Sequence, residues 1–294
     1  MSIPGLPRRD HPSTYVVQDR SNKEELTRLC FQDQMLTTSM GGVLSEQADP
    51  TSIQRVLDVG CGTGVWLIEA AKTYATMSLL VGVDISRHMI EYASEQARKQ
   101  QVSERVEFHT MDALRMLEFP AEYFHLVNQR LGMSYLRTWD WPKILQEFMR
   151  VTKPGGIIRL TESDVIIESN SPALMRANSV FLNALSHAGH LFTPDRLGII
   201  NALESLLRQQ GAQDVRTHDY TLDYRAGTPE WQLFFEDMKH MMQTFAPFAR
   251  KWSPRPEDPE TPGQEDLTQQ ALSEMQHPDF VATWHLRTVW GTKP

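Results

Sequence analysis

The stretch Arg55–Gly64, RVLDVGCGTG, decides how this chain folds. Its first half, Arg55–Val59, has the apolar composition of a short buried strand, and its second half places glycines at positions 60, 62 and 64. Glycine allows a tight turn and lets a ligand approach the backbone without meeting a Cβ atom. The spacing differs from the G-x-G-x-x-G of dinucleotide-binding loops, and no Gly-Lys-Ser or Gly-Lys-Thr follows, as a P-loop requires. The stretch therefore predicts a strand, a ligand-binding turn and then a helix over Val65–Tyr74.

Strands and helices alternate beyond this stretch. We expect strands at Leu79–Val83, Val106–His109, Phe124–Val127 and Ile157–Thr161, with helices between them at Arg87–Gln100 and Trp141–Val151. This alternation is typical of a parallel sheet with helices on both faces. After Glu162 the pattern predicts mainly helices. It also predicts two further strands, one between these helices and one at the end of the chain. The expected helices are Pro172–Ala188, Pro194–Gln210, Trp231–Phe248 and a short one ending at Met275, and the expected strands are Val215–Leu222 and Phe280–Trp290.

Polar residues follow four successive strands of the predicted sheet. The glycine turn follows the first strand, Asp84 the second, Met111-Asp112-Ala113 the third and Asn128-Gln129-Arg130 the fourth. Because the carboxyl ends of parallel strands meet at one edge, where ligands bind open α/β sheets, these residues are expected to share one site. Asp84 could accept hydrogen bonds from two ribose hydroxyls, and Asp112 could accept one from an adenine amino group. The arrangement favours a nucleoside ligand.

Four motifs resemble those of class I S-adenosylmethionine-dependent methyltransferases. They are VLDVGCGTG (56–64), VGVDIS (81–86), TMDAL (110–114) and LQEFMRVTKPGGIIRLTESD (145–164), and FVATWHLRTVWGTKP (280–294) resembles the last strand of that fold. The resemblance implies an α/β protein with a seven-stranded, mostly parallel, doubly wound sheet whose last strand is reversed. It also implies an N-terminal helical lid, helical insertions, and an enzyme that uses S-adenosylmethionine. One departure is His125, where many relatives carry Asp.

The same resemblance implies where the cofactor is held. The residues that would face its methionine end are Asp58, Gly60, Cys61, Gly62 and Gly64. Those that would hold its ribose and adenine are Asp84, Ile85, Met89, Met111, Asp112 and Ala113. Asn128 and Gln129 would line the sulfonium end, close to the transferred methyl group.

Catalytic residues are harder to assign, since methyl transfer from a sulfonium needs an aligned nucleophile and at most one base. The candidate bases are Glu162, Asp164 and His190, with His187 and His240 as further possibilities. Each could equally cap a segment, pack in the core or lie in solvent. His187 and His190 could also suggest a metal, but no third ligand is evident, so we predict no metal site.

We expect three regions along the chain. Residues 1–22 form a flexible leader, 23–50 an N-terminal helical lid, and 51–294 the methyltransferase domain, with helical substrate-cover insertions at about 163–210 and 229–278. The second insertion carries an apolar stripe that either packs in the core or lines an apolar or aromatic substrate pocket. Its members are Trp231, Phe234, Phe235, Met238, Met241, Met242, Phe245 and Phe248.

The amino-acid composition limits the classes of substrate and the cellular location that we expect. The 29 basic and 37 acidic residues give a net charge of −8, which disfavours a nucleic-acid substrate. Two cysteines, Cys30 and Cys61, are typical of reduced thiols in the cytoplasm, and no apolar run is long enough to cross a membrane. We therefore expect a cytoplasmic enzyme, a homodimer being possible, that methylates an O, N or C atom of a small molecule such as an apolar or aromatic specialised metabolite. The alternatives are a protein or RNA methyltransferase and a fold that binds S-adenosylmethionine but catalyses a non-methylating reaction. A nicotinamide-dependent oxidoreductase is disfavoured by the glycine spacing.

Overall fold

The computed structural model describes residue 15 and residues 23–164, 166–193, 198–252 and 264–294. Apart from Tyr15, the predicted leader at 1–22 lies outside the described residues, and so does the start of the helix predicted from Pro194.

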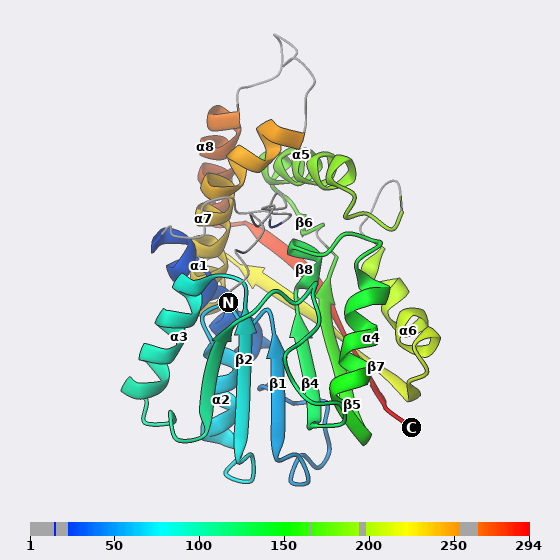
Figure 1. The fold of residues 1–294 in the computed structure, drawn as a ribbon. Helices are drawn as coiled ribbons and strands as arrows, with labels where there is room; N and C mark the ends of the chain where they lie inside the picture. Colours follow the sequence, from blue (N-terminus) through cyan, green and yellow to red (C-terminus); the bar gives the residue numbers. More distant parts are fainter. Residues whose placement is uncertain (1–14, 16–22, 165, 194–197, 253–263) are drawn as a thin grey trace, which may run out of the picture.

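Five parallel strands form the part of the sheet that positions the site. They are β1 (Arg55–Val59), β2 (Leu79–Asp84), β3 (Val106–Thr110), β4 (Phe124–Arg130) and β5 (Thr152–Ser163), in the order β3-β2-β1-β4-β5 (Figure 1). All five were expected from the sequence, although β4 and β5 run further than the apolar runs that predicted them.

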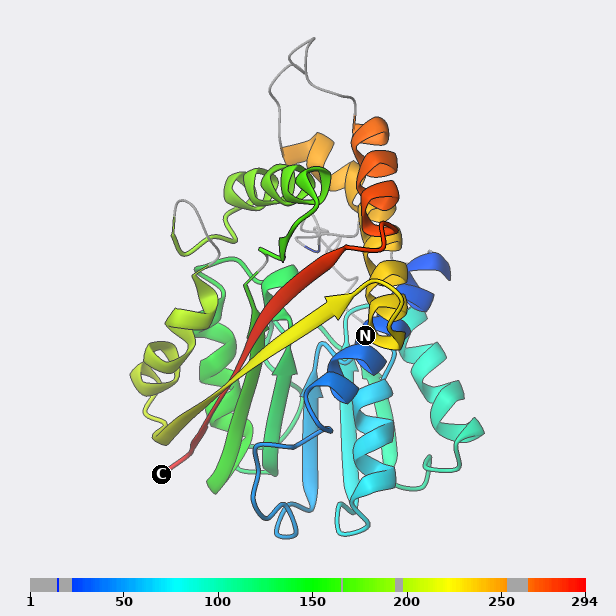
Figure 2. The ribbon, with the colours of Figure 1, turned by 180° about the vertical axis from the view of Figure 1, so that it is seen from behind.

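The C-terminal strand completes the sheet. Strand β8 (Val281–Thr292) pairs antiparallel with β5 on one side and with β7 (Gln213–Arg225) on the other (Figure 2). The predicted mostly parallel sheet with a reversed strand is therefore confirmed, with β8 inside the sheet rather than at its edge. A two-residue strand, β6 (Glu168–Ser169), also pairs with β8, within a segment that was expected to be helical.

Helices cover both faces of the sheet because strand residues alternate between them. Val56, Leu80 and Leu126 pack with α2 (Val65–Thr73) and α3 (Arg87–Lys99). The neighbouring positions Leu57, Val81 and Val127 share a second core with α4 (Trp141–Val151) and α6 (Ile199–Gln209). Within the described part of the chain, no helix has the length and apolar character needed to span a bilayer.

A cover of helices stands over the carboxyl ends of the strands (Figure 1). It consists of α1 (Lys23–Ser39), α5 (Pro172–Ala188), α7 (Pro229–Trp252) and α8 (Gln264–Met275). These helices share a third core with β7 and β8, in which the rings of Tyr224 and Phe234 stack with centroids 4.2 Å apart. The cover is thus packed onto the extended end of the sheet.

The turn between β1 and α2 is held in a backbone conformation that favours glycine. Gly60, Gly62 and Gly64 have φ angles of +72°, +51° and +74°. At Gly64 the space is also filled, since a Cβ atom there would lie 2.5 Å from the ring of Phe108 and 2.9 Å from the Cβ atom of Ala93. The turn therefore tolerates no side chain at this position without movement of its neighbours.

We expect Gly64→Ala to lower the free energy of unfolding by roughly 2–5 kcal/mol. About 1–2 kcal/mol comes from the left-handed backbone and about 1–3 kcal/mol from overpacking against Phe108. Gly155→Ala is the matched control, because Gly155 has φ +73° and no atom lies within 4 Å of the place that its Cβ atom would take. That control should lose only about 1–2 kcal/mol. Urea unfolding measures both losses, and equal losses would contradict the steric argument.

Candidate functional site

A cavity of about 250 Å³ opens where the strands end beneath the helical cover. Its lower wall comes from the glycine turn, the end of β2 and the residues that follow β3 and β4. Its upper wall comes from α1, α5, α7 and β8. The cavity therefore lies at the edge of the sheet where the sequence placed the ligand.

Most of the residues predicted to hold the cofactor line the lower wall. These are Asp58, Gly60, Cys61, Gly62, Asp84, Ile85, Met89, Met111, Asp112 and Ala113. Gly64, Asn128 and Gln129 were predicted with them but are not part of the wall. Gly64 lies against Phe108 instead, and the other two belong to β4.

Two carboxylates stand at neighbouring strand ends. The carboxylate of Asp84 accepts hydrogen bonds from the backbone N–H groups of Gly62 (3.2 Å) and Ser86 (2.7 Å), which ties the glycine turn to the end of β2. The Oδ1 atom of Asp112 accepts one from the backbone N–H of Leu114 (3.0 Å). Carboxylate oxygens accept more than one hydrogen bond, so both side chains remain suited to hydroxyl or amino donors of a ligand. Together with the apolar wall residues Ile85 and Met89, they could hold the ribose and adenine of a nucleoside.

Asp58 reaches the cavity, and Asn128 holds it from below. The Nδ2 atom of Asn128 donates to Oδ1 of Asp58 at 2.7 Å, and the guanidinium of Arg159 donates to Oδ1 of Asn128 at 2.8 Å. Burial raises the pKa of Asp58 to about 7, although the positive charge of Arg130 and the hydrogen bond from Asn128 act in the opposite direction. Asn128 therefore supports a wall residue, Asp58, and is not itself part of the cavity wall.

Glu162 lies behind the wall and organises the turn after β4. Its buried carboxylate accepts hydrogen bonds from the backbone N–H groups of Gly132 (2.7 Å) and Met133 (3.2 Å) and from Nε2 of Gln129 (3.3 Å). Burial raises the pKa of Glu162 to about 8. From this position Glu162, together with Gln129, stabilises the turn after β4. Met133 and Tyr135 of that turn line the cavity.

The other candidate bases also lie away from the cavity wall. Asp164 borders a separate hollow that also includes Asp219 and Arg287. His190 is buried, with Nδ1 2.8 Å from the carbonyl oxygen of Met133, and burial lowers its pKa. Of the described residues that line the cavity, none is Glu162, Asp164, His187, His190 or His240.

The upper wall is mainly apolar. Its apolar residues are Leu36, Phe181, Met238, Met241, Phe245 and Trp284, joined by Ile167 from the segment between β5 and β6. The rings of Phe181 and Phe245 meet edge to face with centroids 4.3 Å apart. The apolar stripe of α7 is thus divided, since Met238, Met241 and Phe245 line the cavity whereas Phe234, Met242 and Phe248 do not and pack in the cores.

Charged residues of α1 also line the cavity, although no sequence motif singled them out. Arg28 pairs with Glu25 at 2.8 Å and with Asp237 of α7 at 3.0 Å, all three being buried. Asp33 pairs with Arg130 at the end of β4. The Arg28–Asp237 partners are 209 residues apart, and no local pattern signals a contact between residues so distant in sequence.

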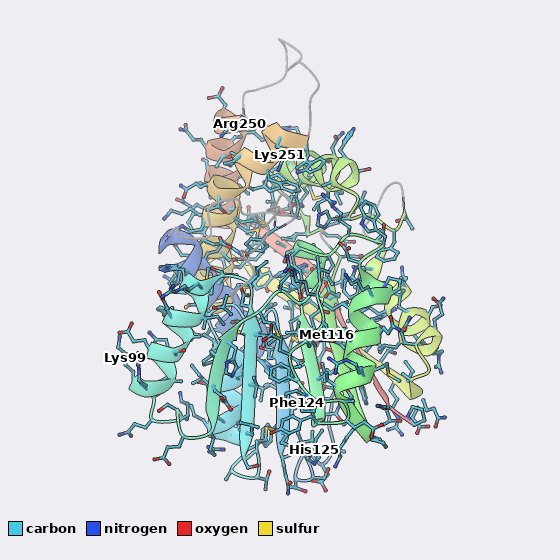
Figure 3. The ribbon with its side chains drawn as sticks, in the orientation of Figure 1. Lys99, Met116, Phe124, His125, Arg250 and Lys251 are labelled. Carbon is cyan, nitrogen blue, oxygen red and sulfur yellow. The ribbon has the colours of Figure 1, made fainter. Side chains whose placement is uncertain are left out.

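His125, the departure from the family motif, is remote from this cavity. Figure 3 shows it at the opposite end of the sheet, near the start of β4. Its Nδ1 atom accepts a hydrogen bond from the backbone N–H of Arg55 at 3.2 Å. The missing Asp therefore has no direct bearing on the ligand site.

Comparisons with known proteins agree with this geometry. A family profile described as a methyltransferase domain matches residues 56–156. The methyltransferase GfsG of Streptomyces halstedii is 33% identical over 127 residues, which cover 42% of this chain and 42% of that protein. The aklanonic acid methyltransferase DauC of Streptomyces sp. (strain C5) is 30% identical over 153 residues, covering 49% of this chain and 68% of that protein. The chain spans less than half the length of the first curated relatives that it matches.

A solved structure shows the same fold. A phosphoethanolamine N-methyltransferase 2 of Haemonchus contortus superposes with a TM-score of 0.57 at 18% identity, covering 95% of this chain and 60% of that one. The strand order, the glycine turn with its strand-end carboxylates, and the similarity to DauC lead to one conclusion. The chain belongs to the class I S-adenosylmethionine-dependent methyltransferases.

Proposed function

We propose that this protein transfers a methyl group from S-adenosylmethionine to an O, N or C atom of an apolar or aromatic small molecule. The observation that carries the proposal is the continuity of the cavity. One side offers strand-end carboxylates and a glycine turn, and the other offers an apolar wall. A nucleoside cofactor and an apolar acceptor would thereby share one enclosed space.

The cofactor would lie along the lower wall and would supply an electrophilic methyl group. Asp84 and Asp112 would hold its ribose and adenine, and Asp58 with the backbone of the glycine turn would hold its methionine end. The chain's own contribution is then to orient the acceptor atom toward the methyl group.

The acceptor would lie against the upper wall. Among the apolar side chains there, Ser163, Asn178 and Thr244 supply polar groups that could orient it. Small-molecule sites commonly combine an apolar lining with a few polar groups of this kind. The names of the relatives support this class, since one is an aklanonic acid methyltransferase and another a demethylmenaquinone methyltransferase.

Calorimetric titration with S-adenosylmethionine, S-adenosylhomocysteine and NAD(H) tests the cofactor. We expect binding of the two sulfur compounds and none of the nicotinamide compound. Mass spectrometry of candidate acceptors then tests methyl transfer, because the product gains one CH₂ unit. Conversion of an acceptor without that mass gain would contradict the methyltransferase proposal.

Asp84→Ala should weaken S-adenosylhomocysteine binding by about 1.5–3 kcal/mol, because it removes a charged acceptor for the ribose hydroxyls. Asp49→Ala is the control. Asp49 accepts from the backbone N–H of Thr51 at 3.0 Å, two residues on, much as Asp84 does from Ser86, but it lies outside the cavity wall. Calorimetry should show unchanged affinity for the control, and equal affinities of the two variants would argue against a ribose site at Asp84.

Met241→Ala should raise the KM for the acceptor by roughly tenfold, because an apolar wall contact is lost. Its affinity for S-adenosylhomocysteine should stay within about twofold of the wild type. Met116→Ala, an exposed methionine outside the cavity wall, is the control and should leave both quantities unchanged. A Met241→Ala variant that instead weakened S-adenosylhomocysteine binding and left the KM for the acceptor unchanged would contradict the assignment of the upper wall to the acceptor and of the lower wall to the cofactor.

A further inference from the structure

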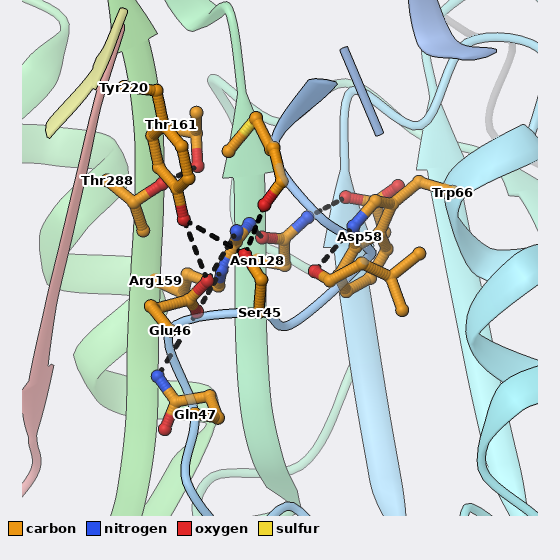
Figure 4. Close-up of polar contacts among 12 residues, drawn as sticks. Ser45, Glu46, Gln47, Asp58, Trp66, Asn128, Arg159, Thr161, Tyr220 and Thr288 are labelled. Carbon is orange, nitrogen blue, oxygen red and sulfur yellow. Dashed lines mark hydrogen bonds and ion pairs between the residues drawn. The ribbon is translucent and has the colours of Figure 1, made fainter. Parts of the chain in front are cut away.

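A row of buried polar side chains crosses three strands beneath the cavity (Figure 4). Asp58 of β1 is in register with Asn128 of β4, which is in register with Arg159 of β5. The three side chains are joined by the hydrogen bonds from Arg159 to Asn128 and from Asn128 to Asp58. All three residues are buried, so water does not readily replace these bonds.

Glu46 closes the row on the side away from Asp58. Its carboxylate accepts hydrogen bonds from Nε of Arg159 at 2.7 Å and from Nη2 of Arg159 at 3.1 Å. Both side chains are at most 1% exposed. Tyr220 donates to the same carboxylate at 3.4 Å, and the ring of Trp66 lies 5.9 Å from the guanidinium carbon. Two parallel hydrogen bonds of this kind fix the plane of a guanidinium as well as its position.

The donors and acceptors of the row permit one orientation of the central amide. A guanidinium only donates, so Asn128 must turn its oxygen toward Arg159. Its NH₂ group then points at Asp58, whose Oδ1 atom must accept. Without Arg159 the amide could rotate by half a turn and present its oxygen instead, which would match a protonated Asp58.

We propose that Glu46 and Arg159 are positioning residues for the cofactor site, acting through Asn128 to keep Asp58 as a hydrogen-bond acceptor. The inference rests on the proposed function, in which Asp58 faces the methionine end of the cofactor. An accepting carboxylate at this position suits the cationic amino group of that end. The segment after α1 would thereby influence the cofactor through a chain of contacts, without touching it.

The protonation of Asp58 makes the inference measurable. Besides burial, its surroundings include Arg130 and Arg159, which lower its pKa, and Asp33, which raises it; Cys61 and Tyr135 also face it. With a pKa of about 7, Asp58 loses its charge as the pH falls through neutrality. Affinity for a ligand with a cationic amino group should therefore decline on the acidic side of neutrality.

The experiment is calorimetric titration with S-adenosylhomocysteine over a range of about pH 6 to pH 9, which brackets the expected titration of Asp58. The test variant is Glu46→Met/Arg159→Met, because an apolar pair can replace a buried ion pair without a large loss of stability. The control is Thr161→Val/Thr288→Val, which removes an equally buried hydroxyl pair, 2.8 Å apart, on β5 and β8. Asn128→Leu is a second test variant that leaves the Glu46–Arg159 pair intact.

For the wild type and the control, affinity should rise with pH through about 7, whereas in both test variants the rise should begin about one pH unit higher. This shift corresponds to about fivefold weaker binding at pH 7 and to nearly tenfold weaker binding at about pH 6, where Asp58 is mostly protonated in both proteins. A folded test variant with the wild-type affinity and pH profile would overturn the inference, and Asn128→Leu decides it if the double variant does not fold. Absence of wild-type binding at every pH would instead refute the proposed function.

Discussion

The site depends on one carbonyl group. The oxygen of Val83, at the end of β2, accepts hydrogen bonds from the backbone N–H groups of both Gly60 (2.8 Å) and Cys61 (3.0 Å). These bonds draw the turn after β1 onto the neighbouring strand, so that Asp58, the glycine backbone and Asp84 have fixed relative positions. Because Gly60 has φ +72°, a residue with a side chain would resist this path. The lower wall of the cavity is therefore set by backbone geometry before any ligand contributes.

The two walls of the cavity arise from different kinds of contact. The lower wall joins residues that neighbouring strands bring together by their regular pairing. The upper wall joins helices from distant parts of the chain, and buried charges such as Arg28 and Asp237 lie at their junction. Removing one partner of such a pair leaves an uncompensated buried charge, so the junction of the cover helices depends on both residues being present.

The five parallel strands and the strand-end carboxylates could be predicted from the sequence because both follow from the alternation of local patterns. Asp84 and Asp112 lie where that reasoning put them. Asn128 and Glu162 do not line the cavity, and the reason is the same for both. Apolar runs ended the predicted strands at Val127 and Thr161, but the strands continue to Arg130 and Ser163.

Each added residue turns the next side chain to the opposite face, so the polar residues directly after an apolar run are drawn into the sheet. Arg130 and Ser163, at the true strand ends, reach the cavity in their place. The length of a strand depends on the strands that pair with it and the elements that cover it. It cannot be predicted from a single apolar run in the sequence. The charged contacts of α1 were missed for a related reason, since they join residues far apart in sequence.

Strand β8 has a consequence for the order in which the fold can be assembled. Paired strands between β1 and β5 are separated in the chain by at most two helices. By contrast, β5 pairs with β8 across more than a hundred residues, as in the pairing of Ile157 with Thr292. Contacts so distant in the chain close slowly, because their loop entropy must be overcome before they stabilise anything. The lower wall of the cavity can therefore form early, whereas the upper wall forms only once β8 has brought Trp284 into place. If the proposed function holds, an intermediate in which only the strands β1 to β5 are paired would present the surface for the nucleoside cofactor before the surface for the acceptor existed.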